Sequence, residues 1–300
     1  MQARSPSGAQ CELRAGSARA TVVEVGGGLR TLQDGEREVL DGYPAQQRAQ
    51  AGRGQVLAPW PNRLGGGAYR FDGVGYQLPV NDLPAGNAIH GLVRWQRWNL
   101  EPGDTQDVVR ASTVLAPQPG WPTWLELAIE YRLRAGGLAV SVTARNAGPQ
   151  PCPFGFGMHP YLAVASGRVD DAVVTIPYDR RLLVDDGGLP VRWAEVDAGT
   201  DFRDGRLVGT TVLDTCYATG SGGVTVDVDD SRVWADGAFR YVQVFTGDTD
   251  PAAQRRRSAL AVEPMTCPPD AFRTGEGLIR LAPGEQWSGR WGIDWAPRPE

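Results

Sequence analysis

The stretch WLELAIEYRLRAGGLAVSVTAR, at residues 124–145, decides the fold. Apolar residues occupy every second position on both sides of Gly136-Gly137, a pattern typical of strands that bury one face. Two glycines between such runs are a hairpin signal, because glycine adopts the positive φ angles that tight turns need. The preceding run DVVRASTVL, at 107–115, alternates in the same way. We therefore predict that these runs are neighbours in one antiparallel sheet.

Short strands and turns continue along the rest of the chain. Asp34-Gly35 and Asp72-Gly73 are hairpin signals, and the 39 glycines and 23 prolines predict many turns. No segment keeps an apolar spacing of 3.6 residues beyond about two turns, so we expect little helix. Strands spaced by about 8–12 residues are typical of a sandwich or barrel. Further strands are predicted at 172–176, 182–184, 224–228, 232–234, 241–246, 259–263, 278–281 and 286–292.

We predict one large all-β domain, a sandwich or barrel, at residues 20–300. All-β domains of about 250 residues occur as single units, and no repeat or low-complexity linker divides the chain. The polar residues 1–19 are expected to form a flexible segment before this domain. The polar stretch 247–258 is expected to be an exposed loop, with Arg255–Arg257 at its solvated tip.

Charge and composition exclude several classes of function. The net charge of −5 argues against nucleic acid as a partner, because such binding depends on basic patches. The chain has no lysine, which excludes a Schiff-base lysine and a Walker A loop. No apolar stretch is long enough for a membrane-spanning helix, and the first twenty residues lack a signal-peptide core. We expect a cytoplasmic protein with free thiols, since its four cysteines are widely spaced.

Two histidines are the only ones in the chain. His90 lies in NAIHGLVRWQRW and His159 in FGFGMHPYL, so turn formers and aromatic residues flank both. We expect both at loop edges that strands hold in place, where catalytic groups are common. A structural or surface role is the alternative for each histidine taken alone.

Three charged residues are further candidates for a site. Glu263 follows the apolar run LAV and precedes Pro264, which predicts a half-desolvated carboxylate with a raised pKa, suited to a general base. Asp214 lies in TVLDTCY, and Arg63 in the irregular segment LAPWPNRLGGG. The alternatives are an ion pair with arginine for Glu263, a turn cap for Asp214 and a surface position for Arg63.

Five segments in this order resemble the aldose 1-epimerase (galactose mutarotase) family. They are PWPNRL with the following GAYRFDG hairpin, AIHGLVR, HPY, LDTCY and VEP, and they include both histidines. The resemblance runs from about residue 20 to the C-terminus. It implies a single galactose mutarotase-like supersandwich with a sugar in a cleft on one sheet.

The resemblance also implies a role for each matching residue. Glu263 resembles the catalytic base and His159 the catalytic acid, while His90, Arg63 and Asp214 resemble residues that hold sugar hydroxyls. Phe245 resembles an aromatic wall of the cleft. Trp60 is a further candidate for stacking on a sugar, argued only from its neighbours in the sequence.

The implied reaction interconverts the α and β anomers of a hexose such as glucose or galactose. It needs an acid and a base on one hemiacetal and no metal or cofactor. An imidazolium near its ordinary pKa of about 6.5, kept protonated by a neighbouring carboxylate, would supply the acid. The expected partner is a small sugar, and the expected assembly is a monomer or homodimer. A phosphorylated or sulfonated sugar stays open, with Arg94 and Arg97 close in sequence.

Three other functions stay open at this point. Two histidines and a glutamate match some zinc sites, although His90 and His159 lack the usual helical spacing. A non-catalytic carbohydrate-binding protein of the same fold is possible with ten tryptophans, but it needs no acid and base. A glycosidase would pair Glu263 with Asp214 and leave the HPY and PWPNR segments without a role.

Overall fold

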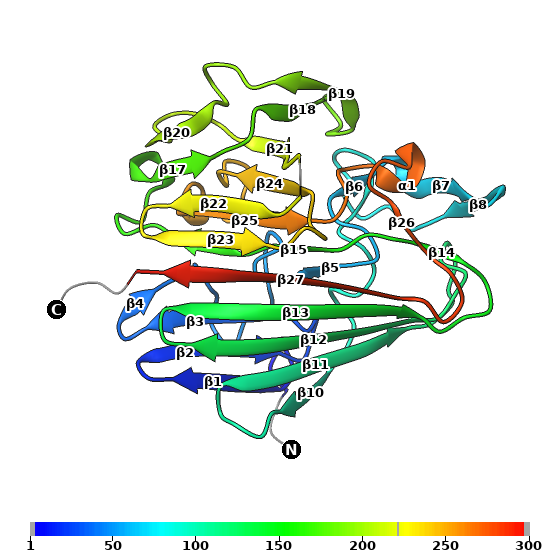
Figure 1. The fold of residues 1–300 in the computed structure, drawn as a ribbon, viewed down its shortest axis with the longest axis horizontal. Helices are drawn as coiled ribbons and strands as arrows, with labels where there is room; N and C mark the ends of the chain where they lie inside the picture. The colour runs from blue at the N-terminus through cyan, green and yellow to red at the C-terminus, as the bar shows by residue number, and fades with distance from the viewer. Residues whose placement is uncertain (1–3, 221, 297–300) are drawn as a thin grey trace.

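Two large antiparallel sheets form most of the protein (Figure 1). The computed structural model describes residues 4–220 and 222–296. The nine-stranded sheet has the order β10-β11-β12-β13-β27-β23-β22-β17-β20. Its strands, in chain order, are β10 (Asn99–Pro102), β11 (Val108–Leu115), β12 (Leu125–Arg134), β13 (Gly137–Asn146), β17 (Val173–Ile176), β20 (Phe202–Leu207), β22 (Val224–Val228), β23 (Ser231–Ala235) and β27 (Gln286–Trp295).

The eight-stranded sheet carries the site described below. Its order is β19-β18-β21-β24-β25-β15-β5, and β16 also pairs with β25. Its strands are β5 (Val56–Leu57), β15 (Gly157–Met158), β16 (Tyr161–Ala163), β18 (Arg180–Val184), β19 (Pro190–Glu195), β21 (Asp214–Ala218), β24 (Tyr241–Phe245) and β25 (Ala259–Met265). β25 packs against β23 of the larger sheet, so the two sheets enclose a common core.

Smaller elements complete the fold. A four-stranded sheet holds β1 (Gln10–Ala15), β2 (Ala18–Val23), β3 (Leu29–Asp34) and β4 (Arg37–Glu38). Three two-stranded sheets pair β6 (Arg63–Leu64) with β9 (Ala88–Ile89), β7 (Ala68–Phe71) with β8 (Val74–Gln77), and β14 (Cys152–Phe154) with β26 (Ile279–Leu281). The helical elements are α1 (Ala271–Thr274) and the 3-10 turns η1 (Gly65–Gly67), η2 (Val169–Asp171) and η3 (Ala253–Arg255).

The alternation in the sequence explains the long strands. In β12 every second residue from Leu125 to Leu133 is buried, and the residues between them are mostly exposed. Ile129 lies opposite Val142 of β13, and both are buried in the core. Each such side chain contributes about 1.5–3 kcal/mol by leaving water. The predicted all-β sandwich with little helix is confirmed, and so are the three neighbouring antiparallel strands around residues 107–145.

The prediction that residues 1–19 form a flexible segment is wrong for most of that range. β1 pairs with β2 from Gln10 to Ala15, and Leu13 is completely buried. Both strands pack against β12 because their apolar residues cover its inner face. Strand pairing therefore begins at residue 10, inside the segment that was predicted to be flexible. Residues 1–3 of the predicted segment lie outside the described residues.

The predicted solvated tip at Arg255–Arg257 is wrong for Arg255 and Arg257, whereas Arg256 is exposed. Arg255 forms an ion pair with Asp41, and Arg257 forms ion pairs with Asp170 and Asp248. These contacts hold the loop 247–258 against the body of the protein, beside the cleft. In the part of the chain that the structure describes, no helix is long and apolar enough to cross a membrane.

Candidate active site

A cleft of about 270 Å³ lies over the eight-stranded sheet. Strands β21, β24 and β25 form its floor, and loops from distant parts of the sequence form its walls. Its lining includes Glu263, His159, His90, Arg63, Asp214, Phe245, Tyr161, Arg94, Trp95 and Asp250. Six of the seven predicted site residues therefore meet in one place.

Glu263 reaches the cleft through the two-residue period of β25. Leu260 and Val262 point into the core, so Glu263 points to the opposite face. β25 continues to Met265, and Glu263 is thus an interior strand residue, not the last one as the sequence predicted. Gln243 is its cross-strand neighbour on β24. The carboxylate is only 3% exposed because the loops around the cleft cover this strand.

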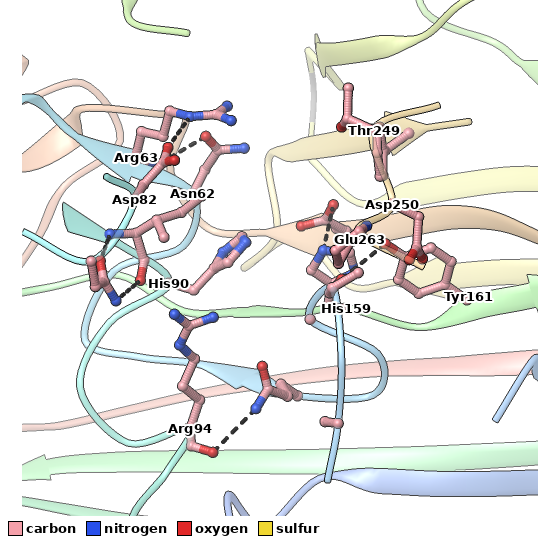
Figure 2. Close-up of a pocket in the computed structure, with 18 of the residues that line it drawn as sticks. Asn62, Arg63, Asp82, His90, Arg94, His159, Tyr161, Thr249, Asp250 and Glu263 are labelled. Carbon is pink, nitrogen blue, oxygen red and sulfur yellow. Dashed lines mark hydrogen bonds and ion pairs between the residues drawn. The ribbon is translucent and has the colours of Figure 1, made fainter. Parts of the chain in front are cut away.

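His159 and Glu263 form a direct pair at the centre of the site (Figure 2). The His159 Nε2 atom lies 3.3 Å from Glu263 Oε1, and both side chains are buried. His159 directly follows β15, and β16 begins two residues later. The ring stacks on Tyr161 with a centroid distance of 5.0 Å and an interplanar angle of 7°. The imidazole is therefore held in one orientation against the carboxylate.

Further contacts fix the stacked rings of His159 and Tyr161. The guanidinium of Arg53 lies over the ring of Tyr161, with its carbon 4.2 Å from the ring centroid. Arg53 is itself fixed by Asp250 at 2.6 Å and Asp41 at 3.0 Å. A Cβ atom at Gly52 would lie 2.3 Å from His159 Cδ2, so only glycine lets this loop pass the imidazole. These contacts leave His159 little freedom to turn.

Burial shifts both members of the pair toward their neutral forms. Burial, reinforced by the charges of Arg53 and Arg94, lowers the pKa of His159 to about 3. Burial and the charge of Asp214 raise the pKa of Glu263 well above its usual range. Both shifts favour the neutral forms, so a proton held by the pair is favoured on Glu263 over His159 in the free protein. This differs from the sequence prediction of an imidazolium with an ordinary pKa, because the histidine is almost completely buried.

His90 is the second ring that contacts His159, in addition to Tyr161. The rings of His90 and His159 meet edge to face at a centroid distance of 5.3 Å. His90 directly follows β9, adopts a φ of 64° and donates its backbone N–H to Asn62. Burial and the neighbouring His159 lower the pKa of His90. Its neutral imidazole has a buried Nδ1 that makes no hydrogen bond within the described residues.

Arg63 and Asp214 form the third side of the cleft. The Arg63 Nε donates to Asp82 at 2.9 Å, and its Nη1 lies 3.9 Å from Asp214 Oδ2. Gln243 donates to the other Asp214 oxygen at 2.5 Å. The Asp214 side chain remains about half exposed toward the cleft. This wall presents donors and acceptors together, which is what a sugar hydroxyl requires.

The two predicted aromatic residues have different positions. Phe245 ends β24 opposite Asp214 and lines the cleft. Trp60 does not line it, and this prediction is corrected. Its ring is 3% exposed and packs on Phe272 with a centroid distance of 5.5 Å. The surrounding prolines turn Trp60 into the core, where it cannot stack on a ligand in the cleft.

Several cleft residues were missed by the sequence reasoning. Trp95 is 46% exposed at the rim, and Asp250, Tyr161 and Gln55 line the walls. Trp95 lies within the motif around His90, and Tyr161 is the last residue of HPY. Both motifs therefore signalled these neighbours. Asp250 and Gln55 carry no signal because only the folded loops bring them to the cleft.

The other predicted chemistries can now be compared with the geometry. Arg94 lines the cleft, whereas Arg97 lies outside it and pairs with Glu24 at 2.5 Å. Among residues 4–220 and 222–296, no three histidine, cysteine or carboxylate side chains form a metal-binding cluster. The cysteines described are free thiols.

Comparison with known proteins agrees with this site. A sequence profile of the aldose 1-epimerase family matches residues 10–293. The chain belongs to the aldose 1-epimerase family. This family consists of isomerases that act in carbohydrate metabolism, so the predicted class of enzyme is confirmed.

Individual relatives support the same membership. The protein is 32% identical to the uncharacterized protein YihR of Escherichia coli K12, over 93% of this chain and 91% of that protein. It is 30% identical to the galactose mutarotase of Rattus norvegicus over 54% of this chain and 47% of that protein.

Solved structures share the fold at lower identity. A GalM/aldose epimerase homologue from C. elegans aligns with a TM-score of 0.83 and 17% identity, covering 96% of this chain and 98% of the other. Galactose 1-epimerase from Lactobacillus acidophilus aligns with a TM-score of 0.80 and 19% identity, covering 96% and 94%.

Proposed function

We propose that this protein interconverts the α and β anomers of a glucose-like or galactose-like hexose. The observation that carries the proposal is the buried pair of His159 and Glu263, 3.3 Å apart on the wall of a polar cleft. An acid and a base on one hemiacetal are what ring opening requires. Family membership supports the same reaction class.

The proton inventory of the pair suits the reaction. Ring opening begins with the shared proton on His159 and the negative charge on Glu263. The short distance between Nε2 and Oε1 allows the proton to move between them. Glu263 then takes the proton from the C1 hydroxyl, the C1–O5 bond breaks, and His159 gives its proton to O5. Each positioned transfer contributes about 10²–10⁴-fold.

The second half of the reaction restores the pair. The open-chain aldehyde rotates about C1–C2 and presents its other face to the O5 hydroxyl. His159 takes the O5 proton back as O5 attacks C1, and Glu263 returns a proton to the new C1 oxygen. No net proton is gained or lost, so one pair completes the cycle without a cofactor.

The remaining cleft residues would hold the sugar during rotation. Arg63 and Asp214 face the cleft as donor and acceptor, and Phe245 adds an apolar surface. Buried polar atoms without partners in the described chain gather here, namely His90 Nδ1, His159 Nδ1, Glu263 Oε2 and Gln55 Oε1. Unsatisfied buried polar groups cost about 1–3 kcal/mol each, and a bound polyol can satisfy them. We expect a sugar as the partner, a cytoplasmic location, and a monomer or homodimer.

Polarimetry on freshly dissolved α-D-glucose and α-D-galactose tests this proposal directly. The protein should speed the approach to the anomeric equilibrium without changing the equilibrium rotation. Binding without acceleration would favour the alternative of a non-catalytic carbohydrate-binding protein. Absence of acceleration with every aldose tested, including those named below, would overturn the proposal.

A further inference from the structure

We propose that the hexose bound in this cleft carries an anionic group, held by Arg94, with Arg48 adding positive charge beside Trp95. This inference rests on the proposed function and names the substrate class of the same site. Its central observation is an arginine inside the cleft that has no acidic partner among residues 4–220 and 222–296. The shared ligand chemistry is a phosphate, sulfonate or carboxylate substituent on the sugar.

Arg94 differs from the other arginines of the site in having no counterion. Arg63 pairs with Asp82, and Arg53 pairs with Asp41 and Asp250. The ion pairs of the described residues do not include Arg94. Figure 2 shows its guanidinium extended toward His90, away from its backbone carbonyl, which accepts a hydrogen bond from Gln55. Its Nε is buried and makes no hydrogen bond in the described chain.

The acidic groups of the cleft are committed elsewhere. Asp82 and Asp250 neutralise the other two arginines, and Glu263 contacts His159. Asp214 accepts from Gln243 and faces Arg63. A partly buried guanidinium without a partner is costly, since an unpaired charge loses hydration and gains no Coulomb attraction. An anion from the ligand would offset that cost.

Trp95 marks the end of the cleft where the anion would lie. The guanidinium carbons of Arg94 and Arg48 lie 5.5 Å and 5.6 Å from the centroid of its half-exposed ring. Arg48 is exposed and, like Arg94, takes part in no ion pair among the described residues. Two arginines around one aromatic ring give a positive surface, and the planar guanidinium suits oxyanions because it donates two parallel hydrogen bonds.

An anion at this position would also help the chemistry. Arg94 is one of the charges that lower the pKa of His159. An anion beside Arg94 would cancel part of that effect and favour the proton on His159, which is the form that opens the ring. Binding of the anionic substrate would thus favour the protonated, acidic form of His159.

The test compares anomer exchange by NMR for glucose, glucose 6-phosphate, glucuronate and 6-deoxy-6-sulfoglucose. We expect kcat/KM to be at least about 10-fold higher for one or more anionic sugars than for glucose, given the strength of charged hydrogen bonds. The ranking among the three anions identifies the group. Inorganic sulfate and phosphate should inhibit the wild-type protein competitively.

Variants separate a charge effect from a structural effect. Arg94→Gln should lower kcat/KM for the preferred anion by about 10–100-fold and change that for glucose by less than about 3-fold. Arg94→Lys should restore part of the loss. The matched control Arg97→Gln, outside the cleft, should change neither value.

Four results would overturn the inference. Glucose turned over as well as every anionic sugar would do so while leaving the proposed function intact. Equal losses for glucose and the preferred anion in Arg94→Gln would assign Arg94 to sugar hydroxyls. No inhibition of the wild type by sulfate or phosphate would contradict an anion subsite even if the variants do not fold. Acceleration of no sugar would remove both proposals.

Discussion

Strands β12 and β25 lie in different large sheets. Each buries one face in the core, but the opposite faces of the two strands have different surroundings. β12 buries one face and exposes the other, where Glu126 and Glu130 form surface ion pairs with Arg145 and Arg110. β25 is buried along its whole length. Its inner face joins the core, and its outer face carries Glu263 into the cleft. The same two-residue period thus places charged side chains on the surface in one sheet and inside the cleft in the other.

The difference arises from what covers each strand. The outer face of β12 is exposed to solvent, so its charged side chains keep their hydration. Loops 51–55 and 249–251 cover the outer face of β25, so Glu263 and His159 lose their hydration. Backbone strain gathers here as well, because the cleft residues Ala51, Asn62 and His90 all have φ between 50° and 64°. Such conformations cost about 1–3 kcal/mol each and are often found at functional sites.

The largest effect is expected from His159→Asn, which changes the buried pair at β25. The variant keeps a polar side chain but cannot donate a proton to O5, so kcat for anomer exchange should fall by about 10²–10⁴-fold. Polarimetry at substrate saturation measures the loss. Circular dichroism should show an unchanged fold, since the asparagine is smaller than the imidazole it replaces. Turnover within about 3-fold of wild type would remove His159 as the acid.

Ile129→Ala should destabilise the buried face of β12. The change leaves a cavity in the core under β12 and should lower the free energy of unfolding by about 2–5 kcal/mol, as urea denaturation measures. The matched control Arg145→Ala removes an exposed ion pair from the neighbouring strand and should cost less than about 1 kcal/mol. Both variants should retain kcat at 25 °C. A large activity loss in folded Ile129→Ala would mean that the two sheets are coupled.

The smallest expected effect is that of pH near neutrality on kcat/KM of the wild-type protein. A pair with one proton loses function when His159 gains a second proton, near the lowered pKa of about 3, or when Glu263 loses the remaining one at high pH. We therefore expect kcat/KM to change by less than about 3-fold between pH 6 and pH 7.5 and to fall on the alkaline side. A tenfold fall from pH 7.5 to pH 5.5 would instead indicate an acidic limb near the ordinary pKa of histidine.

The sequence predicted the fold better than the surroundings of the site. Strict alternation in 124–145 identified β12 and β13 because one face of each is solvated. The motifs identified Glu263, His159, His90, Arg63, Asp214 and Phe245, all of which line the cleft. Arg53 and Asp250 were not predicted, since 197 residues separate the two partners of this buried ion pair. Trp60 was misplaced because local sequence does not show toward which side an irregular segment turns.

The central claim is that Glu263 acts as the base of the buried pair, and Glu263→Gln tests it most directly. Anomer exchange by NMR, with calorimetric titration of the same sugar, separates chemistry from binding. We predict that exchange falls by at least about 10²-fold while Kd changes by less than about 5-fold. Exchange at the wild-type rate in a variant that still binds the sugar would contradict the claim.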